Sequence, residues 1–176
     1  MNIVLIGYRG TGKTEVAKLI AERLNMKNIG MDAEIVMKAG MSIPEIVDKY
    51  GWTKFRDMES DLAGQLSQRD NIIIDTGGGV IERPENIEAL RENSIVFWLQ
   101  ASVDVVVSRI ESGTERPALT EGKSFTEEVA EVLEGRVSKY SDAAHNKINT
   151  DSKTPAQVAG EIIDIWGNVY NTIPKK

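Results

Sequence analysis

A short stretch near the start of the chain, rich in glycine, constrains the fold most. It matches the phosphate-loop pattern G-x-x-x-x-G-K-[ST] at every fixed position, reading Gly7-Tyr8-Arg9-Gly10-Thr11-Gly12-Lys13-Thr14. An apolar run at 3–6 precedes it, and apolar residues at helical spacing follow it to about residue 24. Glycines let the backbone wrap closely around an anion, and a helix start supplies positive potential. The stretch therefore predicts a strand, a loop that holds nucleotide phosphates, and a helix.

Two residues of this loop have predicted chemical roles. Lys13 would bring positive charge to the β- and γ-phosphates, and the hydroxyl of Thr14 is a suitable oxygen ligand for Mg²⁺. A glycine-rich turn without a ligand would not need a lysine and a threonine after Gly12. Arg9 varies freely in such motifs and receives no role. The predicted nucleotide-binding set is Gly10, Thr11, Gly12, Lys13, Thr14 and Glu15.

Strands and helices alternate along the rest of the chain. Strands are expected at 3–6, near 29, and at 72–74, 95–99 and 147–149. Helices are expected at 11–24, 32–38, 43–50 and 53–67, from 84, and at 103–110, 125–140 and 154–166. Continuous apolar strands between helices indicate a parallel sheet covered on both faces. We predict one α/β domain over 1–170 and a frayed tail over 171–176.

Composition excludes several classes of protein. The 176 residues carry a net charge of −6, so no overall basic field would gather nucleic acid. The absence of cysteine excludes disulfides, thiolate zinc sites and cysteine nucleophiles, and the single histidine, His145, is too few for a histidine-rich metal site. No signal peptide is recognisable, and no apolar run reaches the ~20 residues of a membrane span. We expect a soluble, monomeric, cytoplasmic protein without nucleic-acid or membrane partners.

A second glycine cluster follows the predicted strand 72–74. Asp75 and Thr76 come first, and Gly77-Gly78-Gly79 follow. In an open parallel sheet, ligands gather at the carboxyl ends of the strands, where Asp32 and Thr14 are also expected. Three glycines there leave room for a substrate near the γ-phosphate. A GTPase is not indicated, because residues 146–149 lack the acid of the guanine-reading motif.

Taken together, the motifs resemble those of the P-loop shikimate kinases over essentially the whole chain. The matching elements are residues 7–14; Asp32; Gly40 with Ser42 and Ile43; Phe55, Arg56 and Glu59; residues 76–79; Arg116, Pro117 and Leu119; and Arg136 with Tyr140. The resemblance implies a three-layer P-loop kinase fold with a five-stranded parallel sheet in the order 2-3-1-4-5. It also implies a substrate-binding segment at about 33–60 and a mobile lid at about 111–124. The implied reaction is phosphorylation of the 3-hydroxyl of shikimate by ATP, in aromatic amino-acid (chorismate) biosynthesis.

The same resemblance implies roles for individual residues. Shikimate would be held by Asp32, Arg56, Gly77, Gly78, Gly79 and Arg136. The catalytic set would be Lys13, Asp32 and Arg116, with Arg116 on the lid and reaching the ATP phosphates. Arg109 and Lys153 would lie near the adenine. The chemistry agrees, because arginine forks suit a carboxylate and an aspartate can align an attacking hydroxyl.

Each of these side chains also has a plainer interpretation. Asp32 could cap the helix that follows it. Arg56 and Glu59 are three apart on a helix and could form a surface ion pair. Arg116 could be a solvated loop charge, and Arg136 could pair with acids on its own helix.

Two positions depart from the family pattern. Shikimate kinases usually carry an acid two residues before the substrate aspartate, where it helps to hold the hydration shell of the magnesium ion. Here that position is Gly30, whereas Asp75 stands where the family commonly has a small uncharged residue. Our hypothesis is that Asp75 compensates for Gly30, which gives Thr14 and Asp75 as the predicted metal residues.

Two other functions stay open at this point. One is a kinase for another small polyol acid, such as gluconate, on the same scaffold. The other is a non-catalytic nucleotide-binding regulator, which Gly30 supports and the complete set of Lys13, Thr14, Asp32 and Arg116 opposes.

Overall fold

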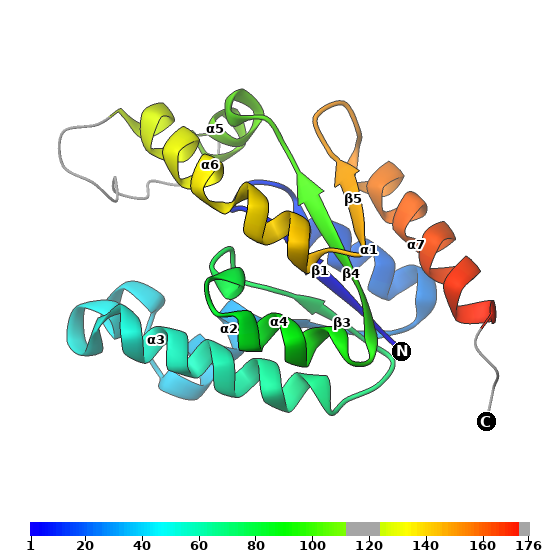
Figure 1. Cartoon of the computed structure of the whole chain (residues 1–176), viewed down its shortest axis with the longest axis horizontal. Coiled ribbons are helices and arrows are strands. Elements are labelled where there is room, and N and C mark those ends of the chain that lie inside the picture. The colour runs from blue at the N-terminus through cyan, green and yellow to red at the C-terminus, as the bar shows by residue number, and fades with distance from the viewer. Residues whose placement is uncertain (112–123, 173–176) are drawn as a thin grey trace.

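The computed structural model describes residues 1–111 and 124–172, and in these residues the chain forms a parallel sheet of five strands (Figure 1). The strands are β1 (Asn2–Ile6), β2 (Lys27–Gly30), β3 (Ile72–Asp75), β4 (Ser94–Gln100) and β5 (Asn146–Asn149). They lie in the order β2-β3-β1-β4-β5, and each neighbouring pair is parallel. This confirms the expected strand order and sheet type.

Helices connect the strands and cover the sheet. They are α1 (Lys13–Leu24), α2 (Met31–Ala39), α3 (Ile43–Ser67), the 3-10 helix η1 (Val80–Glu82), α4 (Pro84–Arg91), α5 (Val103–Glu111), α6 (Phe125–Ala143) and α7 (Pro155–Thr172). The predicted lid at about 111–124 lies almost wholly outside the described residues.

Alternation along the strands divides the core into two layers. In β1, Val4 and Ile6 face one side of the sheet, whereas Ile3 and Leu5 face the other, as the pleat requires. The first side packs against α2, α3, α4 and α6, and the second packs against α1 and α7 (Figure 1). Because both faces are buried, the strands read as continuous apolar runs. The three-layer architecture is therefore as expected.

Helix α3 combines two of the predicted helices. The helical path is interrupted at Gly51, whose φ of 80° and ψ of 164° few residues other than glycine adopt. The helix begins with a capping box: the Ser42 hydroxyl accepts from the backbone N–H of Glu45, and the Glu45 carboxylate accepts from the backbone N–H of Ser42. This bent helix carries Arg56 and Glu59 toward the carboxyl end of the sheet.

The expected end of the last helix was wrong. Helix α7 runs to Thr172 rather than to about residue 166, so two residues of the predicted frayed tail are helical. Trp166 and Tyr170 stack with ring centroids 4.6 Å apart, and both pack into the core layer beneath α1 and α7. Tertiary packing therefore extends the helix beyond its clear sequence period. No helix within 1–111 and 124–172 has the length and apolar character that a membrane span would require.

Candidate active site

The phosphate loop joins β1 to α1 and depends on glycine. Gly7 has a φ of 143°, and a Cβ added there would lie 2.5 Å from the carbonyl oxygen of Leu99. No other residue fits this position without moving the backbone of β4. The loop is therefore packed tightly against the edge where the strands end.

Lys13 is the buried cation of the loop. Its ammonium group donates hydrogen bonds to the carbonyl oxygens of Gly7, at 2.9 Å, and Tyr8, at 3.0 Å. Burial lowers the pKa of Lys13, and the nearby carboxylates of Asp75 and Asp32 oppose that shift. The charge of Lys13 is thus held at the inner wall of the loop, next to two acids from other elements.

Asp75 is the buried acid opposite the loop. The hydroxyl of Thr14 donates a 2.7 Å hydrogen bond to its carboxylate, and only 8% of Asp75 is exposed. Burial raises the pKa of Asp75, while Lys13 and the Thr14 hydrogen bond lower it. In the sheet, Asp75 is paired with Gly30 of β2. Paired residues of neighbouring strands face the same side, so Asp75 and Gly30 share one face.

Thr14 and Asp75 suit a magnesium ion that is also bound by nucleotide phosphates better than a metal ion whose ligands all come from the protein. Within the described residues there is no group of three or more histidine, cysteine, aspartate or glutamate residues able to hold a metal. Magnesium usually keeps several waters and takes one or two protein oxygens together with substrate phosphates. The hydroxyl of Thr14 and the carboxylate of Asp75 form such an oxygen pair beside the phosphate loop.

Asp32 and Glu59 approach the end of β3 together. Asp32 is the second residue of α2, and Gly30 is the N-cap, so the interpretation of Asp32 as that cap was wrong. A Cβ added to Gly77 would lie 2.6 Å from an Asp32 carboxylate oxygen and 2.9 Å from a Glu59 carboxylate oxygen. Glycine at position 77 therefore lets both carboxylates reach the turn. Burial raises the pKa of Glu59, and the charge of Arg56 opposes this.

Arg56 pairs with Glu59, but not on the surface. Glu59 is fully buried and Arg56 is largely so, which excludes the surface-pair interpretation. The guanidinium lies 5.4 Å from the ring centroid of Trp52 and 5.2 Å from that of Phe55. A Cβ on Gly79 would overlap both terminal nitrogens of Arg56. The glycine turn thus fits closely around this arginine.

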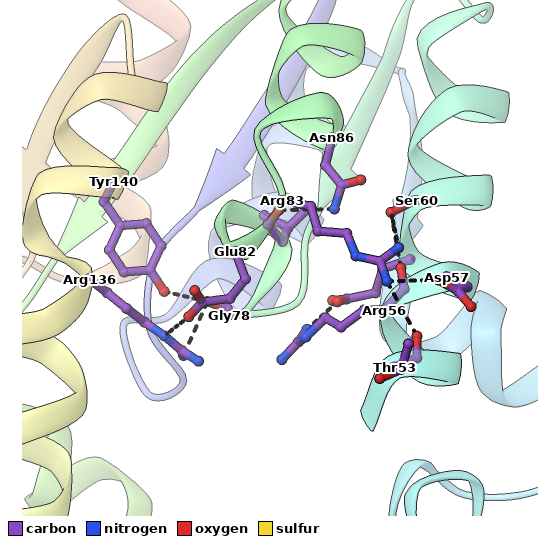
Figure 2. Close-up of polar contacts among 12 residues, drawn as sticks. Thr53, Arg56, Asp57, Ser60, Gly78, Glu82, Arg83, Asn86, Arg136 and Tyr140 are labelled. Atoms are coloured by element: carbon purple, nitrogen blue, oxygen red, sulfur yellow. Dashed lines mark hydrogen bonds and ion pairs between the residues drawn. The ribbon is translucent and has the colours of Figure 1, made fainter. Parts of the chain in front are cut away.

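Arg136 reaches the same turn from α6. Figure 2 shows Arg136 and Arg56 extending from two different helices toward the same space beside Gly78. Arg136 donates a 2.7 Å hydrogen bond to Glu82 of η1 and a 3.4 Å hydrogen bond to the carbonyl oxygen of Gly78. Its partners therefore come from other elements, and the expected alternative of pairing along its own helix was wrong.

Two residues at this turn were missed by the sequence reasoning. Glu82 accepts from Arg136 and also pairs with Lys139, and Tyr140 donates a 2.5 Å hydrogen bond to the carbonyl oxygen of Gly78. Tyr140 was part of a matched motif but had no assigned role. Nothing in the local sequence around Glu82 marks it, because its partners lie more than fifty residues away.

A cavity adjoins the phosphate loop on the side of α5 and α7. It has a volume of about 220 Å³ and is lined by Thr11, Gly12, Glu15, Val16, Arg109, Thr150, Lys153, Pro155 and Val158. Arg109 donates to the carbonyl oxygen of Gly10, at 3.3 Å, and to both the hydroxyl and the carbonyl of Thr150. Lys153 pairs with Glu161. The two residues expected near the adenine thus line one cavity, whereas Arg116 lies outside the described residues.

Comparison with known proteins agrees with this arrangement. The family model described as shikimate kinase matches residues 9–166. The chain belongs to the shikimate kinase family. It is therefore a kinase with ATP as co-substrate.

Individual family members are similar over nearly their full length. A shikimate kinase from Caldicellulosiruptor bescii is 38% identical over 93% of this chain and 94% of its own. The solved structure of a shikimate kinase from Acinetobacter baumannii in complex with shikimate has a TM-score of 0.87 at 31% identity, covering 98% of this chain and 95% of that one. A gluconokinase from Sinorhizobium meliloti has a TM-score of 0.60 at 17% identity, covering 98% and 97%, a likeness that concerns the fold alone.

Proposed function

We propose that this chain transfers the terminal phosphate of ATP to the 3-hydroxyl of shikimate, giving shikimate 3-phosphate and ADP for aromatic amino-acid biosynthesis. Membership of the shikimate kinase family supports the reaction. The observation that carries the proposal is the meeting of Arg56 and Arg136 at the glycine turn after β3, beside the phosphate loop. Two guanidinium groups at one turn suit a small substrate that carries a carboxylate.

The two arginines would bind the substrate carboxylate. Arg56 is backed by Glu59, and Arg136 is backed by Glu82, so each guanidinium is held in place by a carboxylate behind it. Arginines fixed in this way lose little conformational entropy when the substrate arrives. Gly77, Gly78 and Gly79 would lie beneath the ring of shikimate. Larger side chains at these positions would occupy the space that the ring needs.

Asp32 would bind the substrate hydroxyls and align the attacking oxygen. Its carboxylate lies against Gly77 of the glycine turn and interacts electrostatically with Lys13 of the phosphate loop, which supports this role. An aspartate there can accept a hydroxyl hydrogen bond and then the proton. Phosphoryl transfer requires mainly such positioning and neutralised charge, which Lys13 and Arg116, in the expected lid, would supply.

Thr14 and Asp75 would hold Mg²⁺ together with the nucleotide phosphates. The bound ion would neutralise phosphate charge during transfer. The residues Gly10, Thr11, Gly12 and Glu15 would line the nucleotide site, with Arg109 and Lys153 at the adenine.

Some expectations have no further support and stay predictions. These are the monomeric state, the cytoplasmic location, the absence of nucleic-acid and membrane partners, and the division into a substrate segment at 33–60 and a lid at 111–124. Gluconate is not favoured as the acceptor, because the two relatives described above at 38% and 31% identity are shikimate kinases. A regulator without turnover would show ATP binding without shikimate-stimulated ADP release.

An ADP-release assay with Mg-ATP, with and without shikimate, tests the proposal. We expect release to depend on shikimate, to be absent with gluconate, and to fall at least ~100-fold in Asp32→Ala, since loss of a positioned base costs 10²–10⁴-fold. Glu34→Gln on the same helix is the matched control and should keep wild-type turnover. Nucleotide binding without shikimate-dependent release by the wild type would overturn the proposal.

A further inference from the structure

Arg9 has a side chain that leaves the phosphate loop and contacts helix α6. One terminal nitrogen lies 3.5 Å from a carboxylate oxygen of Glu128. The guanidinium carbon is 5.4 Å from the ring centroid of Phe125 and 5.6 Å from that of Tyr8. Phe125 and Glu128 belong to the first turn of α6, so a residue of the phosphate loop is bound to the start of this helix.

This contact is buried, which strengthens its effect. Only 1% of the Glu128 side chain and 21% of the Arg9 side chain are exposed. Among the described residues, Nε and Nη2 of Arg9 are buried without a hydrogen-bond partner, so its charge is balanced by Glu128 and by the aromatic rings. At low local dielectric, moving either charge away from the other is costly. Loop and helix are therefore expected to move together.

The far part of α6 contacts the substrate side of the site. Arg136 and Tyr140 of the same helix both donate to the carbonyl oxygen of Gly78. The backbone nitrogen of Arg9 would be 3.5 Å from a Cβ on Gly78, so loop and glycine turn also adjoin each other. Helix α6 thus contacts the phosphate loop at its beginning and the glycine turn further along.

We propose that Arg9 is a positioning residue that couples the phosphate loop to α6, so that nucleotide binding orders this helix and sets the position of Arg136. A nucleotide fixes the loop backbone, and with it the guanidinium that holds the first turn of α6. Coupling of this kind is reciprocal, so a ligand on Arg136 would strengthen nucleotide binding by the same factor. The proposal thus has two parts, the ordering of α6 by nucleotide and the mutual strengthening of nucleotide and acid binding. Only the second part rests on the proposed function.

Hydrogen exchange of the α6 amides with and without ADP tests the first part, the ordering of α6, without any acid substrate. In the wild type we expect ADP to slow exchange in residues 125–143. Arg9→Met keeps the apolar volume but removes the charge, and Glu128→Gln removes the opposite charge with little change of shape. Both should lose most of the slowing, and Arg9→Lys should keep part of it.

Arg91→Met is the matched control. Arg91 lies at the end of α4 and donates a 2.7 Å hydrogen bond to the carbonyl oxygen of Asp142, so it holds α6 at the end opposite to Phe125 and Glu128. We expect its ADP response to equal that of the wild type. If Arg9 and Glu128 only stabilised the helix, Arg91→Met would weaken the response as well, and the proposal would be wrong.

The second part, the mutual strengthening of binding, is measured as the factor by which ADP lowers the dissociation constant of shikimate. We expect about fivefold or more in the wild type and less than about twofold in Arg9→Met and Glu128→Gln. Unchanged slowing of α6 exchange in both variants would overturn the coupling. So would a loss of ADP affinity in Arg9→Met with a normal response in Glu128→Gln, because Arg9 would then act as a phosphate ligand. If Arg9→Met does not fold, Glu128→Gln decides. Absence of shikimate-dependent turnover in the wild type would instead count against the proposed function.

Discussion

Thr14, at the start of α1, donates a hydrogen bond of 2.7 Å to Asp75, at the end of β3 and 61 residues away along the chain. Asp75 is also the sheet partner of Gly30, the position at which the family usually carries an acid. Two paired residues share a face of the sheet, so an acid at 75 can serve the same side of the site as an acid at 30. The geometry therefore favours the hypothesis that Asp75, on β3, compensates for the missing acid at Gly30, on the neighbouring β2.

We predict that Asp75→Asn weakens magnesium binding. The substitution removes the negative charge next to Thr14, and residues that support a metal site typically contribute 10- to 100-fold in metal affinity. We expect about a 10-fold higher Mg²⁺ concentration at half-saturation, measured by titrating Mg²⁺ into the enzyme–ADP complex and, separately, in the ADP-release assay.

The double variant Gly30→Asp with Asp75→Asn supplies the control. Within the part of the chain that the structure describes, a Cβ at Gly30 would meet only the Cβ of Ala33, at 3.8 Å, so the new side chain has room. We expect it to restore most of the magnesium affinity. Equal magnesium dependence in wild type and Asp75→Asn would contradict the metal role of Asp75.

Gly79→Ala should damage shikimate binding by displacing Arg56. The added Cβ would overlap both terminal nitrogens of Arg56, whereas the backbone of Gly79, with a φ of −102°, accepts alanine. We expect the KM for shikimate to rise about 10-fold, a loss typical of one charged hydrogen-bonded contact, with the KM for ATP nearly unchanged.

Gly135→Ala provides the comparison for this glycine test. Gly135 lies on α6, and among the described residues no atom lies within 4 Å of a Cβ added there. We expect normal kinetics and a free energy of unfolding higher by about 0.5–1 kcal/mol, because alanine favours a helix. A shikimate KM raised equally in both variants would show that Arg56 is not the cause.

Glu82→Gln should lower stability at neutral pH but not in acid. Partial burial raises the pKa of Glu82, but Lys139 and Arg136 outweigh it, so the folded-state pKa lies below its ordinary value of 4.5. An acid with a lowered pKa stabilises the fold above its unfolded pKa, and this contribution is lost as the pH falls through the folded pKa.

We therefore expect Glu82→Gln to unfold about 1 kcal/mol more easily than the wild type in urea at pH 7, with the difference shrinking as the pH falls below the ordinary glutamate pKa of 4.5. The exposed Glu88→Gln on α4 is the control and should match the wild type at both pH values. The loss of a partner for Arg136 should also raise the KM for shikimate. A stability difference that persists unchanged in acid would mean that Glu82 acts through packing rather than charge.

Arg109→Met should weaken ATP binding selectively. Arg109 lines the 220 Å³ cavity beside the phosphate loop, and a guanidinium against an aromatic base contributes about 0.5–2 kcal/mol. We expect the KM for ATP to rise about 3- to 10-fold while the KM for shikimate changes little. Arg23→Met, which removes a guanidinium contact between α1 and α7, is the control. Equal increases in the KM for ATP and the KM for shikimate would contradict a contact between Arg109 and the adenine.

Much of the fold could be read from local patterns. The spacing of Gly7, Gly12 and Lys13 indicated the phosphate loop, and the apolar runs indicated strands buried on both faces. Such features depend on residues close in sequence, whose backbone preferences act before any long-range contact forms. The strand order came from the family resemblance and is confirmed. The early end assigned to the last helix was wrong, because the packing of Trp166 and Tyr170 extends it.

The sequence thus determined the phosphate loop and the α/β class, and it gave the candidate side chains of the site. The tertiary structure decided which of them meet: Asp75 with Thr14, Arg136 with Glu82, and Arg9 with Glu128. Each pair joins elements that are distant in the chain and become neighbours only when helices pack on the sheet. Such contacts leave no periodic or local signal, because they depend on where whole elements lie and not on the residues around them.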